Sequence, residues 1–110
     1  MNTSLRKELL SIKKIDEDTQ AALAKTGELF EGYNRKIEAI HNNNGERLRQ
    51  IVKECGWPGI SMVGKDGAEA AWLVLQHNIG NPEMFKEMLP LLKNAAENDE
   101  IKKSWYAKTL

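Results

Sequence analysis

A helical spacing of apolar residues runs through almost the whole chain, and one sharp break, Gly56-Trp57-Pro58-Gly59, interrupts it. Apolar side chains recur at three- and four-residue steps, and no stretch shows the alternation of a strand. At the break, proline disfavours the helical conformation of Trp57, and the flanking glycines allow positive φ. The pattern predicts an all-α single domain of about five helices, with residues 1–55 before the break and 56–110 after it.

Residues 1–55 are expected to form a long helical hairpin. The apolar spacing predicts a first helix over about residues 3–25, which Thr3 or Ser4 would cap with a hydroxyl oxygen. Gly27 follows this pattern and is a residue type that commonly ends helices.

The second helix of the hairpin is predicted to run from Glu28 to Glu54, and its polar run 41–45 leaves two interpretations open. Asn43 and Glu46 have the spacing of a capping box, which would split the region into two helices. The apolar stripe, however, keeps its phase across the run, and a loop would normally reset that phase. We therefore favour one long helix.

A helix of that length would measure about 40 Å at 1.5 Å per residue. A compact domain of this size has a radius of gyration near 13 Å, so the hairpin would extend beyond its own domain. A second copy would cover the apolar stripe most simply, and we expect a homodimer with two-fold symmetry.

After the break, the sequence predicts a short loop and a helical bundle. Pro90 falls inside one of the predicted helices, so we expect a kink or a break near Met88. The predicted elements are a loop at 60–65, a helix from Asp66 to about Ile79, a helix from Asn81-Pro82 to about Asn98, and a last helix from Ile101 to Leu110.

Composition excludes several classes of partner. Sixteen basic residues balance sixteen acidic ones in 110 residues, so no charge excess points to nucleic acid or an anionic membrane. No apolar run reaches the roughly 20 residues of a membrane span, and the N-terminus lacks a secretory signal, which predicts a cytoplasmic protein. The one cysteine, Cys55, excludes an internal disulfide, and we expect it to be buried and structural.

The segment 56–77 concentrates the residue types that carry chemistry: Trp57, Trp72, Gln76 and His77. One hypothesis places an enzyme or ligand site where these four converge, with His77 as a base or a ligand. The other, which we favour, has His77 hydrogen-bonded to a carbonyl of the Trp57-Pro58 loop. A solvent-open polar pocket with a second titratable group in reach of His77 would support the first hypothesis, and a closed core would support the second.

No metal, cofactor or catalytic set is evident from spacing along the chain. His41 and His77 stand far apart, and no pair of ligands has a recognised spacing. The acidic runs 16–18 and 97–100 are expected to be solvated helix ends. These observations predict a protein without catalytic activity, which fits a binding partner.

Several short motifs lie between about residue 44 and Leu110. They are Arg47-Leu48, Ile51-Val52, Gly56-Trp57-Pro58, Val63-Gly64, Ala70-Ala71-Trp72-Leu73, Gln76-His77, Leu89, Leu91-Leu92 and Tyr106-Ala107. In these motifs the chain resembles a family of small bacterial domains of uncharacterised function. The whole chain is similar to a small Legionella effector that inhibits the ubiquitin-modifying effectors MavC and MvcA. That second resemblance implies a dimeric, all-helical inhibitor in the host cell cytosol, which blocks docking of ubiquitin or its conjugating enzyme.

A partner-binding surface would be expected on the first two helices, because the family signature lies elsewhere. Aromatic and arginine side chains dominate the binding energy of most protein interfaces. The candidate partner-binding residues are therefore Phe30, Tyr33, Arg35 and Arg49.

Overall fold

The computed structural model describes residues 1–26, 35–78 and 81–109. Within these ranges the chain forms five α-helices and no strand, which confirms the predicted all-α fold. The helices are α1 (Thr3–Thr26), α2 (Arg35–Cys55), α3 (Ile60–Gln76), α4 (Pro82–Glu97) and α5 (Lys103–Thr109).

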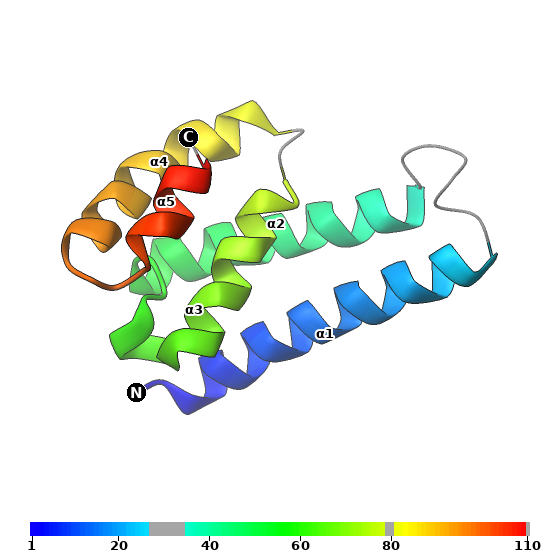
Figure 1. Ribbon diagram of the computed structural model, residues 1–110, viewed down its shortest axis with the longest axis horizontal. Coiled ribbons are helices and arrows are strands. Elements are labelled where there is room, and N and C mark those ends of the chain that lie inside the picture. Colours follow the sequence, from blue (N-terminus) through cyan, green and yellow to red (C-terminus); the bar gives the residue numbers. More distant parts are fainter. Residues whose placement is uncertain (27–34, 79–80, 110) are drawn as a thin grey trace.

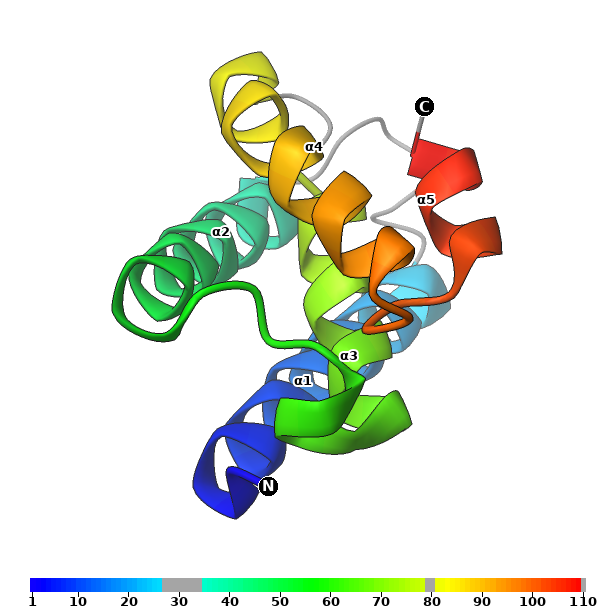
Figure 2. The same cartoon turned by 90° about the vertical axis from the view of Figure 1, so that its left-hand side faces the viewer.

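Helices α1 and α2 lie side by side in opposite directions, and α3 crosses and contacts both (Figure 1). Helices α4 and α5 lie on the side of α3 away from α1 (Figure 2). The far ends of α1 and α2 extend past the other helices, and the molecule measures 42 × 28 × 24 Å. The expected hairpin is therefore present, while the homodimer inferred from it stays a prediction.

Helix α3 is the central buried helix, as its apolar sequence predicts. Its core positions are mostly small, which lets α1 approach closely, and Leu9 of α1 is fully buried. Truncating a leucine in such a position costs about 2–5 kcal/mol. The buried residues of α3 are Val63, Gly67, Ala68, Ala70, Ala71, Val74 and Leu75.

No described helix is long and apolar enough to cross a lipid bilayer.

Helix α2 continues through the polar run 41–45, so the favoured interpretation of that region is confirmed. The phase is kept because His41 and Gly45 occupy the buried stripe at helical spacing between Ile37 and Leu48. The start predicted at Glu28 lies outside the described residues.

Gly45 faces Asn78, the buried residue that follows the end of α3. A β-carbon at Gly45 would lie 2.6 Å from the side-chain oxygen of Asn78. That side chain has little freedom to move, because its amide nitrogen donates to the Val74 carbonyl at 2.8 Å. A glycine inside a helix thus permits the close contact between α2 and the end of α3.

The cap of α1 differs from the prediction. The side chain of Asn2, rather than Thr3 or Ser4, accepts a hydrogen bond from the Leu5 amide at 3.0 Å. Thr3 and Ser4 already lie within the first turn of the helix. Asparagine is as good a cap as serine, so the helix simply starts one residue earlier than the hydroxyl cap would require.

The break between α2 and α3 forms as predicted, with Gly56 at φ 78° and Pro58 buried. Cys55, in contrast, is exposed, so the expectation of a buried cysteine is wrong. It continues the helical spacing of Leu48 and Ile51, but it is the last residue of α2, where the chain turns away at Gly56.

The loop predicted at 60–65 is wrong, because α3 already begins at Ile60. Glu100, which precedes α5, supplies the acceptor that this start needs: its carboxylate binds the Ser61 amide at 2.9 Å and the Ser61 hydroxyl at 2.8 Å. A β-carbon at Gly59 would collide with the same carboxylate. The first turn is therefore stabilised by a residue distant in sequence.

Gly64, at φ 77°, interrupts α3 after its first turn. Asp66 follows, accepts from the Gly67 amide at 2.8 Å and pairs with Arg6 of α1 through both carboxylate oxygens. The helix start expected at Asp66 is therefore wrong, since α3 begins at Ile60 and Asp66 lies inside it.

The C-terminal helices largely follow the prediction. Asn81 caps α4 by accepting from the Met84 amide at 3.2 Å. Near Met88, where we expect a kink or a break, no break is present, since α4 runs continuously through Pro90, whose side chain is exposed. Trp105 of α5 is buried in the core.

Gly45→Ala tests the close contact with Asn78. In an ordinary helix interior the exchange stabilises by up to about 1 kcal/mol. Here we expect a loss of about 1–3 kcal/mol, because the added methyl group overpacks a closed contact. Urea denaturation measures the difference, and Asn43→Ala, at an exposed position of the same helix, is the control. Equal or greater stability of Gly45→Ala would contradict the contact.

Candidate functional site

Asp16 is a buried carboxylate in the middle of α1. It lies on the apolar face of the helix, in helical spacing with Leu9, Ile12 and Leu23, and its side chain is only 4% exposed. The expectation that the acidic run 16–18 is a solvated helix end is therefore wrong for Asp16. The other two acids of the run are exposed.

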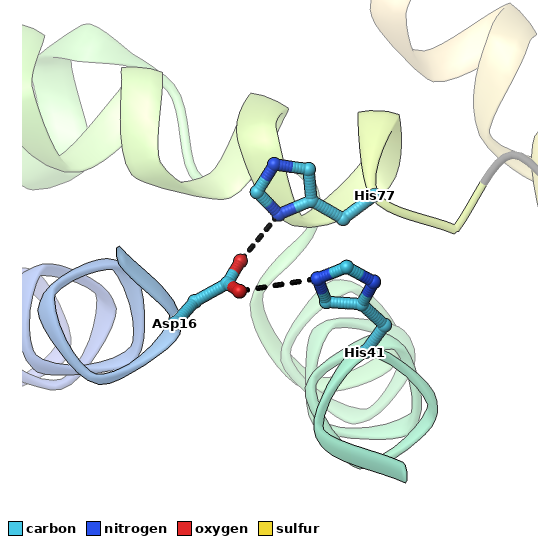
Figure 3. Close-up of side chains that lie close together, drawn as sticks. All are labelled: Asp16, His41 and His77. Carbon is cyan, nitrogen blue, oxygen red and sulfur yellow. Dashed lines mark hydrogen bonds and ion pairs between the residues drawn. The ribbon is translucent and has the colours of Figure 1, made fainter. Parts of the chain in front are cut away.

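Two histidines meet this carboxylate from two other helices (Figure 3). Nε2 of His41, from α2, lies 3.1 Å from Oδ1 of Asp16, and Nδ1 of His77, at the end of α3, lies 2.5 Å from Oδ2. The two imidazole rings stack with their centroids 4.7 Å apart. Gln20, one turn further along α1, donates to Oδ1 of Asp16 at 2.9 Å.

The surroundings keep Asp16 ionised. Burial raises the pKa of its carboxyl group, but the hydrogen bond from Gln20 and the two histidines outweigh burial and hold that pKa below its usual value. An isolated carboxylate in an apolar interior would be very costly, so these partners are what allow Asp16 to lie on a core face.

His77 therefore has a different partner from the one expected. It contacts Asp16 of α1 rather than a carbonyl of the Trp57-Pro58 loop. The reason is its place just after the last turn of α3, at the end opposite to that loop.

The sequence-predicted site does not assemble, because Trp72 and Gln76 face the C-terminal helix. The indole of Trp72 donates to the Thr109 hydroxyl at 2.8 Å, and the amide of Gln76 donates to the same oxygen at 3.0 Å. Trp72 also stacks on Trp105. Trp57 is half-buried, and its indole N–H has no hydrogen-bond partner among the described residues.

Reasoning from spacing along the chain missed Asp16 and His41. Their signal lies in the helical phase: each is a polar residue at a position that continues an apolar stripe. In α2, His41 follows Ile37 by one turn, and both are buried. A charged or titratable residue at a core position needs a hydrogen-bond partner. Asp16 and His41 are two such residues, and with His77 they supply partners for one another.

A small pocket opens beside Asp16 and His77, between α1 and α3. Its volume is about 170 Å³, and one wall is apolar. Lys13 lies on its polar side, 3.4 Å from the Glu69 carboxylate and 3.8 Å from that of Glu17. The lining residues are Ile12, Lys13, Asp16, Glu17, Gln20, Ala70, Leu73, Val74 and His77.

Of the four candidate partner-binding residues, two can be placed. Arg35 is exposed at the start of α2. Arg49 is half-buried and engaged, since its guanidinium binds Glu87 at 2.7 Å and Glu46 at 3.1 Å. Phe30 and Tyr33 lie outside the described residues.

The substitution Asp16→Asn should make the free energy of unfolding less dependent on pH in the acidic range. The folded-state pKa of Asp16 lies below its unfolded value, so its stabilisation is complete above that value and is lost as the pH falls below about 5. At neutral pH we expect the variant to lose about 1–3 kcal/mol, and the difference from wild type should shrink on acidification.

Urea denaturation across this pH range measures the difference. Asp18→Asn is the matched control, because Asp18 is exposed and pairs only with Lys14 at 3.2 Å among the described residues. A constant difference between wild type and Asp16→Asn at all pH values would contradict the assignment.

The comparison with known proteins gives one finding. The sequence profile of DUF6624, a family of unknown function, matches residues 3–106. No curated protein and no solved structure matches the chain significantly. The match covers Asp16, His41 and His77 together with all but the last turn of the helical core. The chain therefore belongs to the DUF6624 family.

Proposed function

We propose that this chain binds a divalent transition-metal ion through Asp16, His41 and His77. The observation that carries the proposal is their convergence: one ligand atom from each residue, two imidazole nitrogens and a carboxylate oxygen, lie within 4.8 Å of one another. Two imidazoles and a carboxylate are a ligand set that zinc and iron(II) both accept.

The separations are close to those of a bound site. A metal holds such ligands at about 2.0–2.2 Å, which places neighbouring ligand atoms about 3.0–3.5 Å apart. Nε2 of His41 lies 3.1 Å from one carboxylate oxygen of Asp16, and Nδ1 of His77 lies 2.5 Å from the other. The three ligand atoms lie within 4.8 Å of one another, so the widest pair has to close by about 1 Å for all three to reach one metal. Since His77 is 31% exposed at the end of its helix, its ring has room to make that movement.

The surroundings of the three residues also suit a metal. Asp16 and His41 are buried, which limits competition from water, and Gln20 orients the carboxylate as an outer-shell partner would. A second titratable group in reach of His77, beside a pocket, is the feature expected of a ligand site or an enzyme rather than of a closed core. This supports the hypothesis of an enzyme or ligand site at His77. The site is formed with Asp16 and His41, however, and not with Trp57, Trp72 and Gln76.

Cobalt(II) binding tests the proposal. Tag-free protein should bind one equivalent of Co²⁺, seen as visible absorption of the ion, and Zn²⁺ should displace it. His77→Ala and Asp16→Asn should each weaken binding by more than about 100-fold, and Gln20→Ala by about 10–100-fold. Asp18→Asn, which changes an exposed carboxylate nearby, should bind as the wild type does.

Circular dichroism shows whether each variant is folded. His77→Ala is the decisive variant, because the partly exposed ring of His77 can be removed with less damage to the core than the buried Asp16. If folded wild-type protein takes up neither Co²⁺ nor Zn²⁺, the three residues form a hydrogen-bonded polar cluster only. Equal affinity in wild type and His77→Ala would place any bound metal elsewhere.

The inhibitory interaction with ubiquitin-modifying enzymes stays a separate prediction. It rests on the resemblance to the Legionella inhibitor and implies a host-cytosolic location and a homodimer. A pull-down from mixed host and bacterial lysate, followed by an assay of the recovered enzyme, tests it. Sedimentation at micromolar concentration tests the homodimer, which a monomer would contradict.

A further inference from the structure

The pocket between α1 and α3 lies directly against two of the three proposed metal ligands. Asp16 and His77 line it, whereas His41 approaches from α2 and does not. A metal held by three protein residues keeps at least one coordination position for an outside ligand. This inference rests on the proposed metal site: since two of its three ligands line the pocket, an outside ligand would reach the metal from there.

We infer that this pocket binds a short-chain carboxylate, with a carboxylate oxygen on the metal and the alkyl chain against the apolar wall. The inference rests on the juxtaposition of a metal position, a lysine and an apolar surface in one small space. No bond is made or broken in the ligand.

The charges around the pocket favour an anion at the metal. A divalent ion bound by one carboxylate and two neutral imidazoles keeps one positive charge. Lys13 adds a positive charge at the pocket wall, but the carboxylates of Glu69 and Glu17, at 3.4 and 3.8 Å, offset much of it. The metal therefore supplies most of the attraction for an anion, and the ammonium group of Lys13 adds a smaller part as a hydrogen-bond donor.

The apolar wall and the volume restrict the rest of the ligand. Ile12, Ala70, Leu73 and Val74 form the wall, and these side chains offer no hydrogen bonds. A pocket of about 170 Å³ is smaller than the roughly 300–1,000 Å³ that hold drug-sized molecules. The fit is thus to an acid with a short alkyl chain, such as propionate or butyrate, and not to a sugar or a nucleotide.

Titration of the Co²⁺-loaded protein with acetate, propionate and butyrate tests the inference. Each acid should change the visible absorption of the ion, and the dissociation constant should fall about fourfold for each added methylene that the pocket buries. Octanoate, which exceeds the pocket, should gain nothing over butyrate. Inorganic phosphate, an anion without an alkyl chain, is the comparison ligand.

Variants separate the pocket from the metal. Lys13→Gln should weaken butyrate binding by up to about fivefold without weakening Co²⁺ binding, whereas Lys14→Gln, at an exposed position of the same helix, should leave both unchanged. Leu73→Ala should weaken butyrate binding and flatten the dependence on chain length.

The outcomes are distinguishable. Failure to bind Co²⁺ would overturn the metal site itself. Normal Co²⁺ binding with a spectrum that no carboxylate changes would overturn the pocket ligand alone. Equal binding of acetate, butyrate and phosphate would also overturn it, because the anion would then be recognised by the metal without the pocket.

Discussion

The buried charge of Asp16 is the constraint on which the arrangement of the first three helices depends. A carboxylate on a core face is tolerated only when several groups compensate it, and each group here comes from a different place: Gln20 from α1, His41 from α2 and His77 from the end of α3. Apolar contacts alone would permit small shifts of these helices along one another. The two directional contacts that come from elsewhere, those of His41 and His77, fix the register of the helices.

Contacts with Asp16 and with the end of α3 explain two of the unusual residues of α2, His41 and Gly45. A helix with a run of asparagines and a glycine in its middle has weak intrinsic stability. Its buried face nevertheless has to present His41 to Asp16 and, one turn later, to let Asn78 approach at Gly45. Both contacts lie close to the end of α3. Residues that weaken a helix are therefore found in α2 where it packs against His77 and Asn78.

The helices were predictable because their apolar period is local, and a local pattern survives in a single sequence. The early start of α3 was not, because its acceptor, Glu100, comes from the far side of the molecule. The cluster of Asp16, His41 and His77 was hidden for the same reason, since its members are close only after α1, α2 and α3 have packed. What the sequence does contain is the misfit of Asp16 and His41 with the apolar stripes that they continue.

The hydroxyl group of Thr109 links the end of the chain to the centre of the molecule. It accepts from Trp72 and Gln76 and donates to the Trp105 carbonyl, so its hydrogen-bonding capacity is fully used. Gln76 is the residue immediately before His77. The last turn of α5 thus holds the last turn of α3 in place through these hydrogen bonds. If α5 detached, the orientation of the neighbouring His77 imidazole would change as well.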